Sequence, residues 1–311
     1  MTRSVTVSIL NYRRTRSLEQ VLRSTRMQTY PDLETIVVDN GSGEETVSHL
    51  RREFPWVKLI ALPENLGASG RNAGISAARG DILITLDNDV YFDTPRDVQL
   101  IVSAFERHPK AGCLAFRVYH PATGRLHARD WAHPRPYQQA EYEEFETHYI
   151  TEGACAFRRA MFQKIEPYWR DLFIGHEGYD LSLRLLDAGY QVWYVPEVRV
   201  WHGHSQETRT SWRPFYFNTK NLFQVAYRNY PWAEGLAFLC PRLALLGFYA
   251  TKSGHFGRFL AGLRDGASTW PAVRPLRQPV TKATLHKLAG MKRLQAGAFT
   301  RAARHWRRSE F

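Results

Sequence analysis

One stretch of the sequence decides the fold: Ile82-Leu83-Ile84-Thr85-Leu86-Asp87-Asn88-Asp89-Val90. Its first five residues are apolar or β-branched, which is typical of a buried strand, and two aspartates follow directly. In an open α/β sheet, ligands bind beyond the carboxyl ends of the strands. An acidic pair at that edge can hold a hard divalent cation, and the cation can hold a diphosphate. The same residues could also form a solvated turn, so the flanking sequence has to decide.

Strand-like and helix-like segments alternate on both sides of this stretch. Before it we expect strands at 5–10, 33–39 and 57–62, with a helix after each of them. This order predicts a Rossmann-like, mostly parallel, doubly wound α/β sheet. Because parallel strands end at the same edge, four polar side chains should meet in one crevice. These are Asn11, Asp39, Asp87 and Asp89.

The second half of the chain changes character twice. A helix is expected at 95–108 and strands at 112–119, 152–157, 191–195 and 198–201, with a helix starting near Glu177. Residues 120–148 have weak periodicity, which fits a functional loop or a disordered insertion. From Trp212 onward the pattern is helical. We therefore expect one α/β unit at 1–210, with halves at 1–110 and 111–210, and a helical, basic extension at 211–311.

Composition limits the function further. The chain has 311 residues, a net charge of +12 and three widely spaced cysteines without a metal or disulfide pattern, which suits a reducing, cytoplasmic compartment. There is no GxGxxG after the first strand and no GxxxxGK[ST], which argues against a dinucleotide oxidoreductase and a P-loop ATPase. Ten Lys and Arg and one acid fall in residues 273–311. Such a tail can bind nucleic acid or anionic lipid, or simply be solvated.

An apolar segment at 236–250 is interrupted by Pro241 and Arg242. We expect it to be too short to span a bilayer. It would instead pack as a core helix or lie on a membrane surface.

Taken together, several motifs resemble those of the family 2 glycosyltransferases, which are inverting enzymes with the GT-A fold. The likeness covers about residues 5–205, and within the family the chain is most similar to the rhamnosyltransferase-type branch. The residues that carry it are Val7-Ser8-Ile9-Leu10-Asn11-Tyr12, Val37-Val38-Asp39-Asn40-Gly41-Ser42, Asn65-Leu66-Gly67, Arg71-Asn72-Ala73-Gly74, Asp87-Asn88-Asp89, the helix start at 177–184, Tyr194-Val195-Pro196 and His202.

The resemblance implies a nucleotide-sugar site and a metal. Asp39 matches an acid that contacts the nucleobase or ribose, and Asp89 matches a metal ligand. Asp87 would lie near the ribose and the metal, and His202 would complete the metal shell or be structural. The ion would be Mg²⁺ or Mn²⁺. The implied nucleotide-sugar site comprises Leu10, Asn11, Tyr12, Asp39, Arg71, Asn72, Asp87, Asn88 and Glu152.

The chain departs from the family at the catalytic base. Members of this family carry an acid pair before the helix, with the second acid as the base. The second position here is Gly178. Either Glu177 is the base, or Asp180 one turn further on is, or the enzyme works differently. Asp180 could instead form an i,i+4 pair with Arg184.

The expected function is metal-dependent transfer of a hexose from a UDP- or dTDP-sugar to a hydroxyl acceptor. The acceptor would be lipid-linked or a glycan of the cell envelope, reached from the inner face of the plasma membrane. A small-molecule acceptor, a catalytically silent binding protein and a homodimer stay open. A nucleotidyltransferase would need a glycine-rich loop after the first strand. Nucleic-acid binding is not expected, because only residues 305–308 place an aromatic residue among basic ones.

Overall fold

The computed structural model describes residues 3–126, 131–203 and 210–293. Ten strands form one sheet: β1 (Val5–Asn11), β2 (Leu33–Asp39), β3 (Lys58–Ala61), β4 (Ile82–Asp87), β5 (Val90–Phe92), β6 (Ala111–His120), β7 (Arg125–Leu126), β8 (Phe145–Thr147), β9 (Ala154–Arg158) and β10 (Gln191–His202). Their order is β3-β2-β1-β4-β9-β6-β10-β5, with β7 beside β6 and β8 beside β10.

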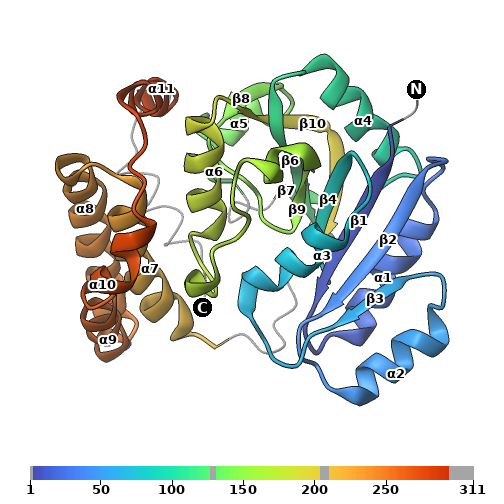
Figure 1. Ribbon diagram of the computed structural model, residues 1–311, viewed down its shortest axis with the longest axis horizontal. Coiled ribbons are helices and arrows are strands. Elements are labelled where there is room, and N and C mark those ends of the chain that lie inside the picture. Colours follow the sequence, from blue (N-terminus) through green and yellow to red (C-terminus); the bar gives the residue numbers. More distant parts are fainter. Residues whose placement is uncertain (1–2, 127–130, 204–209, 294–311) are drawn as a thin grey trace.

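The helices surround this sheet and continue beyond it (Figure 1). Those of the first 210 residues are α1 (Thr15–Arg26), α2 (Glu44–Glu53), α3 (Arg71–Ala77), α4 (Asp97–Arg107), α5 (Tyr137–Ala140) and α6 (Glu177–Asp187). The later helices are α7 (Arg213–Asn229), α8 (Trp232–Lys252), α9 (Phe256–Ala267), α10 (Trp270–Val273) and α11 (Lys282–Arg293). Short 3₁₀ turns are η1 (Gly67–Gly70), η3 (Arg159–Gln163), η4 (Arg170–Leu172) and η5 (Arg274–Leu276).

The parallel direction expected for the first four strands is confirmed, because β3, β2, β1 and β4 all pair in parallel. The sheet becomes mixed at β9, which is antiparallel to both β4 and β6. The two strands expected at 191–195 and 198–201 are one strand, β10. Its register against β6 shifts between Val195 and Arg199, where Pro196 cannot donate a ladder hydrogen bond.

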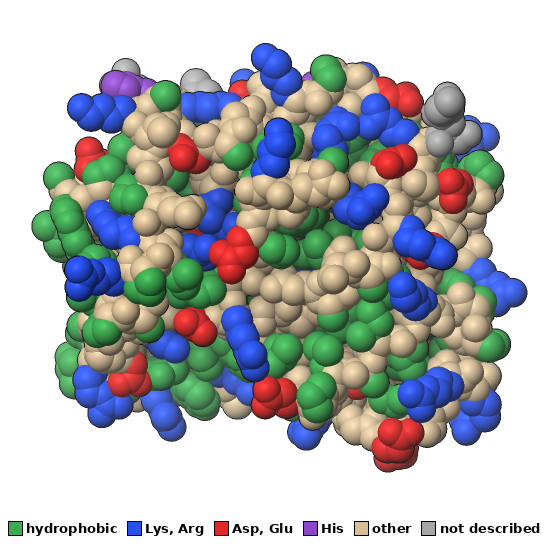
Figure 2. Space-filling model, in the orientation of Figure 1, with side chains coloured by type: hydrophobic (Ala, Val, Ile, Leu, Met, Phe, Trp, Pro, Cys, Tyr) green, Lys and Arg blue, Asp and Glu red, His purple; other side chains and the backbone are tan. Residues whose placement is uncertain are grey.

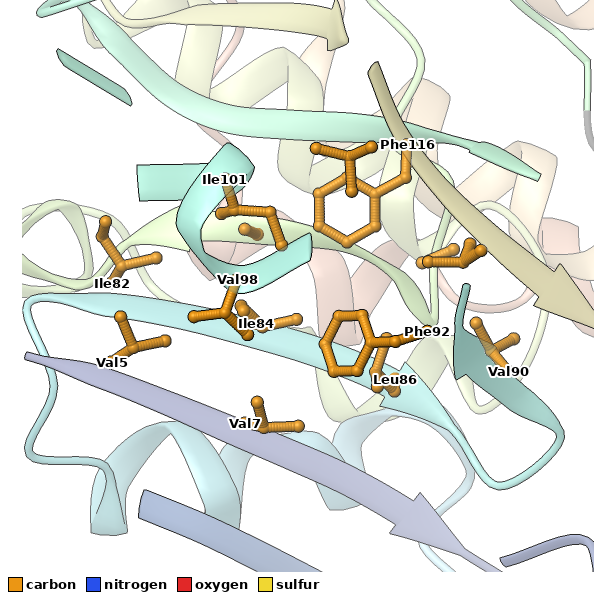
Figure 3. Close-up of a cluster of buried hydrophobic side chains, with 14 of the residues drawn as sticks. Val5, Val7, Ile82, Ile84, Leu86, Val90, Phe92, Val98, Ile101 and Phe116 are labelled. Carbon is orange, nitrogen blue, oxygen red and sulfur yellow. The ribbon is translucent and has the colours of Figure 1, made fainter. Parts of the chain in front are cut away.

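The sheet is covered on both faces because its central strands alternate. Val5, Val7 and Ile9 of β1 face a core shared with α1 and α4, and Ile82 and Ile84 of β4 join them. Figure 3 shows the β1 and β4 side chains directed toward Val98 and Ile101 of α4. The opposite face packs against α3 and α6, with Leu83 and Leu181 among its buried residues. Because both faces are buried, each side chain of these strands is assigned to one face or the other.

The region 120–148 is structured in its described part. Trp131, Ala140 and Phe145 pack on Tyr194 of β10 in a small separate cluster, and β8 adds a strand beside β10. Of the two alternatives, the disordered insertion is therefore wrong for the described residues.

The C-terminal helices form a second layer against α6 (Figure 1). Here α8 corrects the sequence-based expectation, because Pro241 lies inside one continuous helix of 21 residues. Its length and composition are sufficient to cross a membrane. In its apolar 18-residue segment, 33% is buried in the protein. The core helix of a soluble protein passes the same test of length and composition. The part of the expected helical extension beyond residue 293 lies outside the described residues.

Candidate active site

The ends of β1, β2 and β4 bring three polar side chains together. Asn11 stands opposite Asp39 in the parallel register, and its Nδ2 donates to Asp39 Oδ1 at 2.9 Å. Asn88 Nδ2 donates in turn to Asn11 Oδ1 at 2.8 Å. The other Asp39 oxygen accepts the backbone N–H of Ser42 at 2.9 Å. The strand order therefore brings these side chains together at one edge of the sheet, and the Asn11 amide and the Ser42 N–H orient the Asp39 carboxylate.

A candidate cation site lies next to this network. Asp87, Asp89 and His202 each offer one ligand atom, and these atoms lie within 4.8 Å of one another. The group forms because β10 ends at His202, antiparallel to Val90 of β5, which follows the two aspartates. Two carboxylates and one imidazole fit the ligand preference of Mn²⁺ and are compatible with Mg²⁺.

Two arginines flank the two aspartates. Arg14 Nη1 lies 3.1 Å from Asp89 Oδ2, and Arg71 Nη2 donates to Asp87 Oδ1. Burial alone would lower the pKa of Arg71, but the charges of Asp87, Glu152 and Glu177 outweigh it and raise the pKa. Arg71 is only 7% exposed, so a permanent positive charge is fixed between the aspartates and the two glutamates.

The loop before α3 is held by side-chain amides. Asn40 Nδ2 donates to Asn65 Oδ1 at 2.9 Å, and Asn40 Oδ1 accepts the N–H of Leu66 at 2.9 Å. Gly67 has φ +61°, and a Cβ there would lie 2.7 Å from the carbonyl carbon of Phe173. The loop thus needs glycine for both conformation and space, and it sets the start of the helix that carries Arg71.

Asn72 has a structural contact in addition to its expected place beside the nucleotide. Its Nδ2 donates to the carbonyl of Tyr168 at 2.7 Å, and its Oδ1 accepts the N–H of the same residue at 3.0 Å. Both ends of the amide are therefore used to hold the chain before α6. Leu10 and Tyr12 are partly buried at the end of β1 and just after it.

Glu177 and Glu152 lie together at the N-terminus of α6. Glu177 is the first residue of the helix and is 5% exposed, and the N–H of Gly178 donates to Glu152 Oε1. Burial and the nearby charge of Glu177 raise the pKa of Glu152 well above its ordinary value, against the opposing charge of Arg71. This carboxyl pair lies near the metal group, because Asp87 donates its backbone N–H to the carbonyl of Gly153 at 3.0 Å.

The geometry corrects the interpretation of Asp180 as an alternative base. Asp180 is fully buried, and its Oδ2 accepts from Arg184 Nε at 3.0 Å and Nη2 at 2.7 Å. Its Oδ1 accepts from Asn229 Nδ2 at 2.7 Å, and Arg228 Nη1 lies 3.5 Å from Oδ2. A carboxylate enclosed in this way cannot meet an acceptor hydroxyl, so Asp180 joins α6 to α7 instead.

Two residues of the site were not predicted. Arg14 beside Asp89 follows the first strand, and Asn40 follows Asp39 directly in the sequence. The only feature of the sequence that could have identified these two residues is their position shortly after the ends of strands. Other polar residues at the same strand ends were predicted to belong to the site. The contacts that give Arg14 and Asn40 a role come from segments 25 to 75 residues away in sequence.

The geometry defines a class that comparison with solved structures also shows. The fold is that of the GT-A glycosyltransferases. Similar structures include Staphylococcus aureus TarS 1-349 (TM-score 0.58, 15% identity, 93% of this chain and 88% of that one). Another is the mannosyltransferase PcManGT from Pyrobaculum calidifontis in complex with GDP-Man and Mn²⁺ (TM-score 0.57, 18% identity, 100% and 89%).

Residues 5–166, just over half of the chain, match the model of glycosyl transferase family 2. The chain therefore belongs to this family. An uncharacterised glycosyltransferase of Haemophilus influenzae is 28% identical over 193 residues, which cover 58% of this chain and 62% of the relative. The N-acetylglucosaminyl-diphospho-decaprenol L-rhamnosyltransferase of Mycobacterium tuberculosis is 24% identical over 225 residues (61% and 73%). Three of the most similar relatives are matched over only 35–62% of their own length.

Proposed function

We propose that the protein is an inverting, metal-dependent glycosyltransferase that moves a sugar from a nucleotide-diphosphate sugar to a hydroxyl acceptor. The observation that carries this proposal is the Asp87, Asp89 and His202 group beside the Asn11–Asp39 pair. Such a juxtaposition suits one ligand with a diphosphate at one end and a nucleoside at the other. PcManGT and GalNAc-T7 are proteins whose structures carry Mn²⁺ with a nucleotide or nucleotide sugar.

Each group has a distinct task in this proposal. Asp39, fixed by Asn11 and Ser42, accepts hydrogen bonds from the nucleoside, and Leu10 and Tyr12 line the same strand end. Asp87, Asp89 and His202 would hold Mn²⁺ or Mg²⁺, and the ion would neutralise the charge of the diphosphate leaving group. Arg14 and Arg71 contribute fixed positive charge on either side. Glu177 at the start of α6 and the neighbouring Glu152 would receive the acceptor hydroxyl.

The acceptor is proposed to be lipid-linked and part of cell-envelope polysaccharide or glycolipid synthesis. The names of relatives support this: one is an O-antigen chain rhamnosyltransferase of Salmonella anatum, 22% identical over 200 residues (62% of this chain and 63% of that protein). The C-terminal helices also expose large apolar residues, among them Leu236 (59%), Phe248 (63%) and Leu260 (48%). Figure 2 shows apolar side chains beside Lys and Arg over this part of the molecule. That mixture suits contact with an anionic membrane at its cytoplasmic face.

Thermal unfolding with nucleotide sugars tests the donor site. A ligand that binds only the native state stabilises it, by about 2.7 kcal/mol at a hundred times its Kd. We expect one member of a panel of UDP-GlcNAc, dTDP-rhamnose and GDP-mannose to raise the Tm of the wild type in the presence of Mn²⁺. Asp89→Ala should lose this shift, because the metal group is broken.

The matched control is Asp32→Ala, an exposed aspartate just before β2, at the opposite end of the strands from the crevice. It should keep the full shift. If no nucleotide shifts the wild type, or if Asp89→Ala responds like Asp32→Ala, the proposed donor site is wrong. A catalytically silent binding protein would show the shift without hydrolysing the donor.

A further inference from the structure

Gly178 leaves a space that another residue fills. It is the second residue of α6 and has no positive φ, so its backbone does not require glycine. A Cβ at this position would lie 2.7 Å from Glu152 Cγ and 2.8 Å from Glu152 Cδ, which is closer than real carbon contacts. A side chain at residue 178 and the carboxyl group of Glu152 would therefore compete for the same space, and glycine leaves that space to Glu152.

The carboxyl of Glu152 is held in this place from two sides. The N–H of Gly178 donates to its Oε1, so the free N-terminal amides of α6 supply one anchor. On the other side, Gly153 has φ +70°, and a Cβ there would lie 2.6 Å from Asp87 Oδ2. The backbone around Glu152 thus runs directly between the metal group and the start of α6.

The surroundings of Glu152 suit a group that exchanges a proton. Glu177 Oε2 is buried and has no hydrogen-bond partner among the residues that the structure describes. Burial and the charge of Glu177 raise the pKa of Glu152, while the charge of Arg71 and the hydrogen bond from Gly178 oppose the rise. Tyr168 also lies within electrostatic range of Glu152. Two carboxyls so close together hold one proton between them more readily than two charges.

We propose that Glu152 is the catalytic base of this enzyme, supplying from the segment before β9 the carboxylate that α6 lacks at position 178. In the step, the acceptor oxygen bonds to the anomeric carbon, and the bond from that carbon to the diphosphate oxygen breaks. The electron pair leaves with the nucleoside diphosphate, and the acceptor proton goes to Glu152. This inference rests on the proposed function.

Hydrolysis of the donor by water tests the inference without knowledge of the acceptor. Water can take the acceptor's place, so the readout is the metal-dependent hydrolysis of whichever of UDP-GlcNAc, dTDP-rhamnose or GDP-mannose stabilises the wild type. We expect Glu152→Gln to lower kcat about 100-fold or more, as the loss of a general base does. The donor KM and the nucleotide-induced Tm shift should stay close to those of the wild type.

The decisive comparison is between Glu152→Ala and the double variant E152A/G178D. The first opens the space beside the helix, and the second returns an acid to it from residue 178. We expect the double variant to recover about tenfold or more of the kcat that Glu152→Ala loses, which is part of the contribution of a general base. An exposed glutamate of the loop before β8, Glu143, provides the control Glu143→Gln with wild-type kcat.

Three outcomes overturn the inference. The base lies elsewhere, with Glu177 the first alternative, if Glu152→Gln keeps kcat within about threefold of the wild type, well short of the usual loss. Glu152 only shapes the site if E152A/G178D is no more active than Glu152→Ala. It acts on the donor if Glu152→Gln abolishes the nucleotide-induced Tm shift. Failure of the proposed function looks different, because then no nucleotide stabilises even the wild type.

Discussion

At the scale of single residues, Glu152 carries a charge that the folded protein disfavours. Its ordinary pKa of 4.5 is raised by burial and by Glu177. An acid whose pKa is raised on folding destabilises the protein as the pH rises above the unfolded value, because the native state must release a proton that it holds more tightly. The penalty grows by about 1.4 kcal/mol per pH unit until the pH reaches the pKa of the folded protein, and then it stays constant.

Glu152→Gln should therefore unfold at a higher urea concentration than the wild type at pH 8. A neutral amide removes the buried charge and can donate to Glu177. The difference should shrink as the pH falls and disappear near pH 4.5, the ordinary pKa of the side chain. Urea midpoints measured from pH 4.5 to 8.5 check this. Glu143→Gln, on an exposed loop, should show no such trend, and a pH-independent gain for Glu152→Gln would contradict the explanation.

At the scale of elements, α8 packs one side in the core and exposes apolar residues on the other. Core packing and a membrane-surface position were the alternatives expected from the sequence for this helix. It is continuous through Pro241, and it keeps one side buried through Phe238, Leu246 and Ala250 while Leu236 and Phe248 are exposed. Proline inside a helix removes one hydrogen bond. The apolar core shared with α7 and α9 offsets that loss. The exposed side is therefore available for the proposed membrane contact.

The double variant L236E/F248E should weaken binding to vesicles that contain an anionic lipid. Full burial of such side chains is worth about 1.5–3 kcal/mol each, so a loss of about tenfold in partitioning is expected. Cosedimentation with phosphatidylglycerol-containing vesicles measures it. The control is M27E/Y142E, which changes two equally exposed apolar residues on the catalytic part (63% and 73%). Equal binding by both variants, or none by the wild type, would remove the membrane contact from the proposal.

At the scale of the whole molecule, Asp180 joins α6 of the α/β unit to α7 of the helical extension. It pairs with Arg184 of its own helix and with Arg228 and Asn229 of α7. An apolar cluster crosses the same boundary, with Leu183 and Leu186 packed among residues of α7–α9. The two regions expected from the sequence at 1–210 and 211–311 thus share a buried interface, and we expect them to unfold together.

Asp180→Asn should cost about 3–5 kcal/mol in free energy of unfolding, because it leaves buried arginines without their counter-charge. Unfolding of the wild type should be one cooperative transition by both fluorescence and circular dichroism. The exposed Asp171 of η4 gives the control Asp171→Asn, which should be close to neutral. Two separate transitions in the wild type, or an Asp180→Asn cost below about 1 kcal/mol, would show that the regions are independent.

The sequence by itself determined the part of the protein in which the signals are local. Alternating strands and helices predicted the parallel pairing of β1 to β4, and residues at strand ends, such as Asn11, Asp39 and Asp87, were found because parallel strands end at one edge. The family followed from the same motifs. Each of these conclusions needs only a periodicity or a spacing within a few residues.

Only the tertiary structure decided the rest, because it depends on contacts between distant segments. The direction of β9, the pairing of Asp180 with Asn229 of α7 and the ion pair between Arg14 and Asp89 depend on contacts between residues 49 to 76 positions apart. In the sequence, Gly178 stands where the family pattern has the second acid. In the folded protein it is the space that admits Glu152, a residue 26 positions earlier, and no local pattern connects the two.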